Sequence, residues 1–343
     1  MSLGLWEAAR RVNHGLEIPL AVEMVDDFAA VYSRNFPDAH VRRERVEELF
    51  PGAQGDRLTR TELHLREAVG RVDILVGGPP CQGHSDLNNR TRRDDPRNRL
   101  YLRMARAAAV LRPAVVVAEN VTAVQWDSND VVSETRKALE KLDYRVATQV
   151  IDMQRIGAPQ RRRRHLLLAT TNSSIDPAAT LAGLMAVESP QRDLRWAIGD
   201  LETVAPVDMI DRPSVMSETN KRRVDYLFGN GLFELPDDQR PPCHQGGDHS
   251  YKSVYGRLRW DRPAPTITTG FGSMGQGRFV HPSQRRTLTP HEAARIQTFP
   301  DWFDFGPDIR RTRLATMIGN AVPPLLMVRL GVAVLSTLAS QTD

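Results

Sequence analysis

The sequence predicts an α/β protein built on a doubly wound, mostly parallel sheet. Short apolar runs rich in β-branched residues alternate along the first half of the chain with amphipathic helical segments. The runs are continuous rather than alternately polar, which is typical of strands buried on both faces. A chain of 343 residues with 41% hydrophobic residues can also bury a large core. In such sheets, ligands bind at the C-terminal ends of the strands.

Five strands are expected, in short continuous runs bounded by charged residues or by Pro and Gly: residues 18–25, 72–78, 113–121, 144–152 and 164–170. Amphipathic segments between or before them predict helices at residues 26–36, 61–69, 100–111 and 133–142. Strand and helix therefore take turns at the spacing of a helix-covered sheet.

The pattern changes after residue 171. Residues 172–265 are rich in Pro, Gly, Asp and Arg and show weak periodicity, which indicates a second, irregular domain or a long insertion. A helix is predicted again at 288–299, where Thr289 is a suitable N-cap with Glu292 three residues later. The apolar stretch 325–339 is interrupted by Arg329 and is too short for a membrane span, so we expect a packed helix.

Composition limits the classes of function. Two cysteines cannot form a disulfide framework, and no leader pattern begins the chain, so we expect a cytoplasmic protein. The 46 Lys and Arg residues against 42 Asp and Glu give a net charge of +4, which permits nucleic acid binding without requiring it. Cys243, His244 and His249 supply at most three ligands with no second cluster, so no metal site is expected.

Three groups carry candidate chemistry. Cys81 follows the strand 72–78 through Gly-Gly-Pro-Pro, a rigid turn that favours a nucleophile over a small buried residue. Glu119 closes the strand 113–121 and reaches the same edge, unless it is only a cap or a solvated end. In "PQRRRRH", strand alternation would point Arg162 and Arg164 to one side; the alternative is a solvated basic turn.

The segments "GGPPCQGHS", "ENV", "PQRRRRH", "RTLTPHEAARIQTFPD" and "IGNAVPP", in this order, resemble the motif series of DNA (cytosine-5) methyltransferases. The resemblance covers nearly the whole chain apart from a variable stretch near 175–250. It implies a Rossmann-like, S-adenosylmethionine-dependent catalytic domain over residues 1–171, a smaller target-recognition domain over 172–265, and a return segment over 266–343 that completes the catalytic domain.

The resemblance implies a mechanism for methyl transfer to carbon 5 of cytosine. Cys81 would add as a thiolate to carbon 6, helped by the positive charges of Arg162 and Arg164. Glu119 would bind N3 and Arg164 would donate to O2. The base would be flipped out of the duplex, with residues 82–99 closing over it as a mobile loop. Further substrate contacts are expected from four residues: Gln82, Ser85, Asn120 and Gln160.

The implied cofactor is S-adenosylmethionine. Glu23, at the end of the strand 18–25, would bind the ribose hydroxyls, and Asp56 would face the adenine. Without the resemblance, Glu23 is equally a helix-capping acid and Asp56 a turn residue. The other expected pocket residues are Met24, Arg57, Pro79, Leu100, Asn320 and Val322.

The expected partners are double-stranded DNA and a cognate restriction endonuclease, and the protein is expected to be a monomer away from membranes. Two alternatives remain: an RNA cytosine-5 methyltransferase with the same thiolate chemistry, and a DNA-binding relative without activity. The second arises because the family's first strand and its Phe-x-Gly-x-Gly turn have no counterpart before "MSLGLWEAAR". We expect a misplaced start, and a missing central strand would leave two strand edges unpaired.

Overall fold

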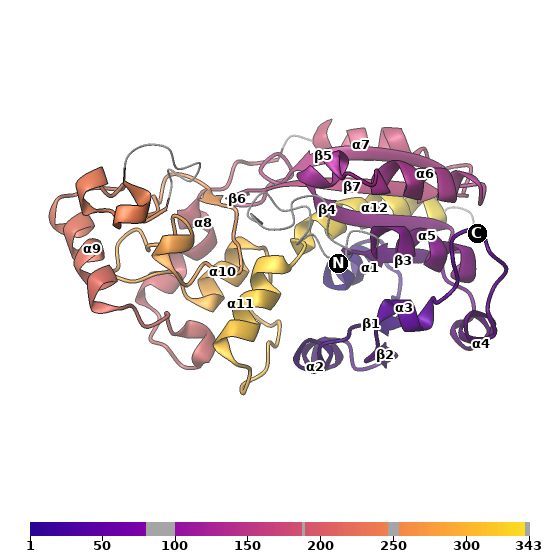
Figure 1. Ribbon diagram of the computed structural model, residues 1–343, viewed down its shortest axis with the longest axis horizontal. Helices are drawn as coiled ribbons and strands as arrows, with labels where there is room; N and C mark the ends of the chain where they lie inside the picture. The colour runs from indigo at the N-terminus through magenta and orange to yellow at the C-terminus, as the bar shows by residue number, and fades with distance from the viewer. Residues whose placement is uncertain (80–99, 187–188, 246–253, 340–343) are drawn as a thin grey trace. The chain divides into compact units, whose positions relative to one another are not determined.

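The computed structural model describes residues 1–79, 100–186, 189–245 and 254–339. The chain forms two compact units (Figure 1). Unit 1 contains Met1–Asp152, Arg163–Glu188 and Pro324–Asp343, and unit 2 contains Met153–Arg162 and Ser189–Pro323. These bounds differ from the predicted domains, because residues 266–323 pack with unit 2 and the chain returns to unit 1 only with its last helix.

Unit 1 carries most of the regular structure. Its strands are β1 (Ala21–Val22), β2 (Val41–Arg42), β3 (Ile74–Gly77), β4 (Val115–Val121), β5 (Arg145–Asp152) and β7 (Arg163–Thr170). Its α-helices are α1 (Ser2–Arg11), α2 (Asp26–Asn35), α3 (Val46–Leu49), α4 (Arg60–Val69), α5 (Leu100–Leu111), α6 (Val131–Glu140), α7 (Pro177–Ala186) and α12 (Pro324–Ala339). The five predicted strands and four predicted helices of this region all form, with ends shifted by a few residues.

The main sheet has the strand order β3-β4-β7-β5 (Figure 1). β3 and β4 are parallel, but β7 runs antiparallel to both of its neighbours, so the expectation of a mostly parallel sheet is wrong for these four strands. The physical reason is the connection. Residues 153–162 join β5 to β7 through unit 2 without the crossover helix that a parallel pair requires.

A separate parallel pair, β1 and β2, precedes the main sheet. Among the described residues, β1 pairs with β2 alone and β3 pairs with β4 alone. The apolar residues of β3 are accordingly only partly buried, whereas β4 is buried from Val115 to Asn120. One edge of β3 and one edge of β1 are therefore unpaired in the described structure.

The sheet is stabilised by helices that pack on it. Val116 and Ala118 of β4, with Leu167 and Ala169 of β7, form a buried cluster with apolar residues of α5 and α6. α7 contacts β5 and β7, and α12 packs against α1 and α7. The α1–α12 contact is close: a Cβ added at Gly4 would lie 2.6 Å from the Met327 Cβ, so this position needs glycine.

The C-terminal apolar segment forms two helices. By length and composition, the span Arg311–Ala339 could cross a membrane. However, α11 ends at Asn320 and α12 begins at Pro324, so the helix is interrupted. α12 buries Leu326, Met327 and Leu330 in the protein, which agrees with the prediction of a packed helix.

Unit 2 is irregular, as its composition indicates. Its α-helices are α8 (Leu194–Ile198), α9 (Glu218–Gly229), α10 (Pro290–Ile296) and α11 (Arg311–Asn320), and its strands are β6 (Gln160–Arg161) and β8 (Ala264–Pro265). Short 3-10 helices lie between these elements, among them η3 (Gly199–Thr203) and η4 (Met209–Asp211). The predicted cap of α10 is confirmed: Thr289 and Glu292 form a reciprocal capping box.

One apolar cluster forms the core of the larger part of unit 2. It joins α8 to residues far along the chain, among them Leu258, Phe279, Leu288 and Ile318. Leu194 and Ile198 lie before residue 265, whereas Leu288 and Ile318 lie beyond it. The predicted boundary at 265 therefore cuts through a single core.

Candidate active site

A buried ion pair lies at the C-terminal end of β4. Glu119 lies near the end of the buried part of β4. Arg164 lies near the start of the antiparallel strand β7, where it is in register with Val121. The Nε atom of Arg164 lies 2.9 Å from Oε1 of Glu119, with side chains 13% and 9% exposed. The two sequence-predicted residues are therefore brought together, with a hydrogen-bond acceptor and a fixed cation side by side.

Asn120 connects this pair to the end of β3. Its Nδ2 donates to the main-chain oxygen of Pro79 at 3.3 Å, while its Oδ1 accepts from the N–H of Val121 at 2.8 Å. Pro79 is two residues beyond β3, so the turn toward position 81 begins beside the end of β4. Cys81, Gln82 and Ser85 themselves, and the expected loop 82–99, lie outside the described residues.

Arg162 lies in unit 2 and binds main-chain carbonyl groups. Its guanidinium donates to the oxygens of Ile267 at 2.9 Å and Ala321 at 3.0 Å, and the side chain is 2% exposed. β6 ends at Arg161 and β7 begins at Arg163, so no continuous strand holds Arg162 and Arg164 on one side. The alternation argument for this pair therefore does not apply.

Gln160 is buried in the same unit. Its Nε2 donates to the main-chain oxygen of Ile296 at 3.0 Å and to Oε1 of Gln297 at 2.7 Å, and its own Oε1 accepts from the N–H of Ile267 at 3.4 Å. These contacts tie β6 to α10 and give Gln160 a structural role. Its predicted contact with the substrate stays a prediction.

The predicted ribose ligand follows β1 directly. Oε1 of Glu23 accepts a hydrogen bond from the N–H of Val25 at 2.8 Å, at the start of α2, so the helix-capping alternative describes one of its contacts. The adjacent Met24 is 57% exposed. A carboxylate and an uncovered apolar side chain are thus neighbours at the end of this strand.

The turn with Asp56 and Arg57 is held by its main chain. Both side chains are exposed, and Arg106 of α5 donates to the carbonyl oxygens of these two residues at 2.8 and 3.2 Å. Arg106 is itself paired with Glu62, with Nη2 and Oε2 2.6 Å apart and both side chains nearly inaccessible to solvent. The Glu62–Arg106 pair therefore holds the turn at Asp56 and Arg57 in place.

Burial would raise the pKa of the Glu62 carboxyl, but hydrogen bonds outweigh this effect. Donors from Arg106 and from the main chain of Thr59 and Gly52 lower the pKa of Glu62 to about 2. This ion pair was not predicted from the sequence. Thr59 and Glu62 have the spacing of a capping box, which was a usable signal, but nothing in the sequence pairs Glu62 with Arg106, 44 residues away.

The remaining predicted pocket residues lie at element ends. Leu100 begins α5 and is partly buried. Asn320 ends α11 and is exposed, and Val322 is buried in the segment after it. The latter two belong to unit 2, whereas Glu23 and Asp56 belong to unit 1. Their roles stay predictions.

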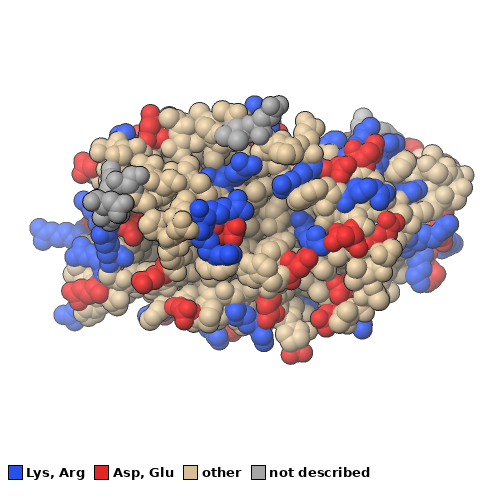
Figure 2. All heavy atoms as spheres, turned by 180° about the vertical axis from the view of Figure 1, so that it is seen from behind, with Lys and Arg blue, Asp and Glu red and all other residues tan. Residues whose placement is uncertain are grey.

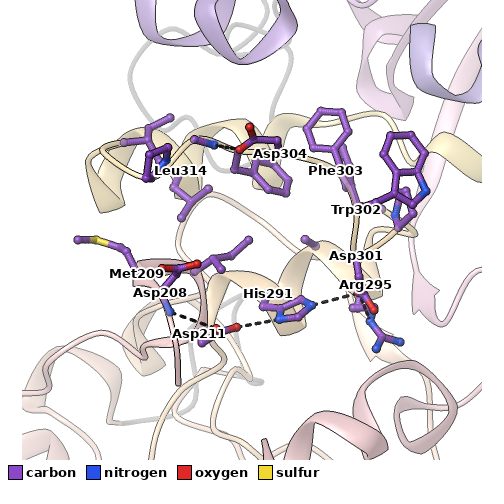
Figure 3. Close-up of a pocket in the computed structure, with 18 residues that line it drawn as sticks. Asp208, Met209, Asp211, His291, Arg295, Asp301, Trp302, Phe303, Asp304 and Leu314 are labelled. Atoms are coloured by element: carbon purple, nitrogen blue, oxygen red, sulfur yellow. Dashed lines mark hydrogen bonds and ion pairs between the residues drawn. The ribbon is translucent and has the colours of Figure 1, made fainter. Parts of the chain in front are cut away.

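A separate cavity of about 430 Å³ in unit 2 contains a network of ion pairs (Figure 3). The ring of His291 lies between Oδ1 of Asp211, 2.8 Å from Nδ1, and Oδ1 of Asp301, 3.1 Å from Nε2. Arg295 extends the network to Asp200. Burial would raise the pKa of Asp211, but hydrogen bonds from His291 and the main chain lower it overall. None of the predicted site residues lines this cavity, and the network joins η4 to α10.

The charges visible on one face of the molecule are mixed. Figure 2 shows Lys and Arg side chains interspersed with Asp and Glu, in keeping with the small net charge of +4. A polyanion would therefore be bound by local groups of arginines rather than by a uniformly basic field.

Comparisons with known proteins show to which sequences and structures this chain is similar. The chain is 44% identical to Type II methyltransferase M1.BsuMI of Bacillus subtilis over 95% of its length and 75% of the relative's. It is 32% identical to Type II methylase M.HgiDII of Herpetosiphon aurantiacus, over 74% of this chain and 73% of that protein. The crystal structure of the S. pombe Dnmt2 methyltransferase has a similar fold, with a TM-score of 0.65 at 14% identity over 99% of this chain and 96% of that one.

The match to the family is nearly complete in length. The sequence model described as C-5 cytosine-specific DNA methylase covers residues 1–336, which include all of unit 2, nearly all of unit 1 and the Glu119–Arg164 pair. The chain therefore belongs to the C-5 cytosine-specific DNA methylase family and is an enzyme of that kind.

Proposed function

We propose that the protein transfers a methyl group from S-adenosylmethionine to carbon 5 of a cytosine in a specific duplex DNA sequence, through a covalent adduct with Cys81. The observation that carries the proposal is the ion pair between Glu119 and Arg164. It lies at the strand edge where Asn120 holds Pro79, two residues before the cysteine. In this proposal, Cys81 is the nucleophile, Glu119 the acid and Arg164 the cation, and all three come from neighbouring segments at one edge of the main sheet.

The first step needs a nucleophile, because carbon 5 of cytosine is not reactive enough to attack a methyl group. The Cys81 thiolate forms a bond to carbon 6, and the C5–C6 π electrons become available at carbon 5 while negative charge spreads to N3 and O2. After methylation, loss of the C5 proton and cleavage of the S–C6 bond restore the aromatic ring and the thiolate. The base is reached by flipping it out of the duplex.

Glu119 and Arg164 act on the charge that develops on the ring. Glu119 takes up a proton from solvent as the base binds and then donates a hydrogen bond to N3, while the guanidinium of Arg164 donates to O2. Since both side chains are nearly buried and already paired, little reorganisation is required when the charge appears. Preorganised donors in a site with little water are worth more than the same groups in solution.

The residues at the ends of β1 and α5 fit the proposed cofactor. Glu23 offers a carboxylate for a ribose diol, and the exposed Met24 offers an apolar surface for an adenine ring. Asp56 and Arg57 are exposed on a turn that Arg106 and Glu62 hold in place. Pro79, Leu100, Asn320 and Val322 are proposed as further contacts. When bound, S-adenosylmethionine supplies the methyl group on a positively charged sulfur.

Recognition of the DNA sequence is assigned to unit 2, and closure over the flipped base to residues 82–99. The relatives M1.BsuMI and M.HgiDII are Type II enzymes, which supports a role in restriction and modification with a cognate endonuclease. A monomer acting in the cytoplasm remains our expectation.

Covalent trapping tests the proposal directly. Fluorine at carbon 5 blocks the elimination step, so duplex DNA containing 5-fluorocytosine should give a protein adduct that survives denaturing electrophoresis in the presence of S-adenosylmethionine. Folded RNA with the same modified base is the comparison. An adduct formed only on RNA would replace the DNA proposal by the RNA alternative, and methylation without any adduct would overturn the thiolate mechanism.

A further inference from the structure

Unit 2 contains a column of alternating arginine and phenylalanine side chains. The guanidinium of Arg257 lies over the rings of both Phe228 and Phe233, with its Cζ 4.1 and 4.8 Å from their centroids. Arg259 lies over the ring of Phe233 at 4.0 Å, and Arg285 lies over that of Phe228 at 5.3 Å. The order along this Arg–Phe column is Arg285, Phe228, Arg257, Phe233, Arg259. Each contact is within the range of a cation–π interaction.

Local backbone structure fixes the column. Arg257 and Arg259 are two residues apart in an extended segment, so they share a side, while Leu258 between them is buried in the apolar core of the unit. The N–H of Arg257 donates to the carbonyl oxygen of Phe233 at 2.9 Å, and the N–H of Leu258 donates to Val280 at 2.8 Å. The two arginines are therefore held in place by both hydrogen bonds and core packing.

The charges along the column are not all compensated. Arg285 is paired with Asp225, with Nη1 and Oδ1 2.7 Å apart. The nearby Arg278 is paired with Glu234, and Nε of Arg257 donates to the carbonyl oxygen of Pro282 at 2.7 Å. For Arg259, the described parts of the chain provide an aromatic ring but no hydrogen-bond acceptor or carboxylate. Among the described residues, Arg259 is therefore the arginine of the column that contacts a ring without a polar partner.

We propose that Arg259, oriented by its stack on Phe233, binds a phosphate of the duplex DNA backbone. A stacked guanidinium keeps the N–H groups on its edge available, and that planar fork matches the oxygens of a phosphate. Little side-chain entropy is lost on binding because the ring already restricts the arginine. The inference rests on the proposed function, because it gives unit 2 a DNA-binding residue. Phosphate contacts fix the position of a protein on DNA without reading its sequence.

The test compares Arg259→Ala with Arg285→Ala in the full-length protein. Arg285 belongs to the same column but is already paired with Asp225, so it is the matched control. The dissociation constant for duplex DNA is measured over a series of salt concentrations, together with the melting temperature. Arg259→Ala should raise the dissociation constant about tenfold and lower the slope of its logarithm against log salt by about 0.9, with a fall in melting temperature no larger than that of Arg285→Ala.

Arg259→Lys separates a charge contact from a structural stack. Lysine keeps the charge but loses the planar stack, so it should recover the salt slope and only part of the affinity. An unchanged salt slope in Arg259→Ala would overturn the proposal, as would a loss confined to one DNA sequence, which would instead indicate contact with a base edge. A loss seen only with folded RNA would overturn it as well.

The same samples distinguish this inference from the proposed function. Methyl transfer to the duplex by the unaltered protein, with an unchanged salt slope in Arg259→Ala, would reject the inference and leave the proposed function standing. If DNA binding is salt-dependent and weakens in Arg259→Ala but the unaltered protein transfers no methyl group, the phosphate contact of Arg259 stands and the proposed function is rejected.

Discussion

Nε of Arg164 lies 2.9 Å from Oε1 of Glu119, across the antiparallel ladder that pairs β7 with β4. Because β7 runs antiparallel to β4, the start of one strand lies beside the end of the other. A parallel β7 would have placed Arg164 at the opposite edge of the sheet. The reversal of this strand is therefore what brings the cation to the carboxylate.

Replacing Arg164 tests the role of this pair. We expect Arg164→Ala to lower kcat by about 10²- to 10³-fold, the usual cost of removing one donor to a developing oxyanion. Methyl transfer under saturating substrate is the measurement. Arg163→Ala is the matched control, since Arg163 is the preceding residue of the same strand and is exposed. Equal rates in the two variants would remove Arg164 from the mechanism.

Arg164→Ala also leaves Glu119 without its cation, so thermal unfolding should be followed in parallel. Arg164→Lys restores a charge without the planar fork, and we expect it to recover folding more fully than kcat. Recovery of both to the same degree would indicate that the pair is only structural.

Cys81→Ser separates chemistry from binding. The hydroxyl is close in size to the thiol but far less ionised at neutral pH, so methyl transfer and trapping by 5-fluorocytosine should both be abolished. DNA affinity should change little. Electrophoresis for the adduct and a filter assay for binding give the two readouts, and normal turnover by the serine variant would end the proposed mechanism.

The fold shows what can be predicted from local patterns. Continuous apolar runs predicted the four longer strands β3, β4, β5 and β7 as well as the region of β1, and the amphipathic segments predicted α2, α4, α5 and α6. Strand direction was beyond reach, because periodicity is the same for parallel and antiparallel strands. It depends on the connection through residues 153–162, which leaves unit 1 and returns. The two-residue strand β2 was too short to produce a pattern.

The site shows the same limit. Glu119 was predicted because it ends an apolar strand, and Arg164 because it begins one. Arg162 has the same residue type in the same basic run, yet it binds the carbonyl groups of Ile267 and Ala321. The break between β6 and β7 separates these two arginines, and four consecutive arginines carry no signal of where a strand is interrupted.

The buried pair of Glu62 and Arg106 should matter for both stability and cofactor binding. Glu62→Gln leaves the Arg106 charge uncompensated, and breaking a buried pair in this way costs about 3–5 kcal/mol. Because Arg106 holds the turn at Asp56 and Arg57, affinity for S-adenosylmethionine should fall as well. Urea unfolding and calorimetric titration are the measurements, with the exposed Glu67→Gln on the same helix as the control. Wild-type stability in Glu62→Gln would contradict this account.

Two buried histidines should make stability depend on pH. Burial lowers the pKa of His165 to about 4 and that of His281 to about 4, from an ordinary value of 6.5. The unfolded chain then binds protons that the folded chain excludes. Stability is fully present above pH 6.5 and falls as pH decreases toward 4, by about 1.4 kcal/mol per pH unit for each histidine.

Urea midpoints between pH 7 and pH 4 measure this effect. His165→Gln should lose part of the pH dependence, whereas His64→Gln, on the exposed side of α4, should retain it. The stability of His165→Gln could instead fall with decreasing pH as steeply as that of the unaltered protein. That result would show that the His165 ring takes up its proton in the folded state.

Exchange of unit 2 tests where sequence specificity is determined. Replacing 153–162 and 189–323 by the corresponding segments of a family member should change the methylated DNA sequence and preserve methyl transfer, because the exchanged parts carry their own apolar core.

A second chimaera that exchanges only 172–265 removes α7 from unit 1 and separates Leu194 and Ile198 from Leu288 and Ile318. We expect that protein to unfold at a lower temperature, since mismatched core contacts cost stability. Methylated sites are mapped by bisulfite sequencing and unfolding by circular dichroism. Unchanged specificity in the first chimaera would remove sequence recognition from unit 2, and equal melting temperatures in the two chimaeras would favour the boundary at 265 over the one at 323.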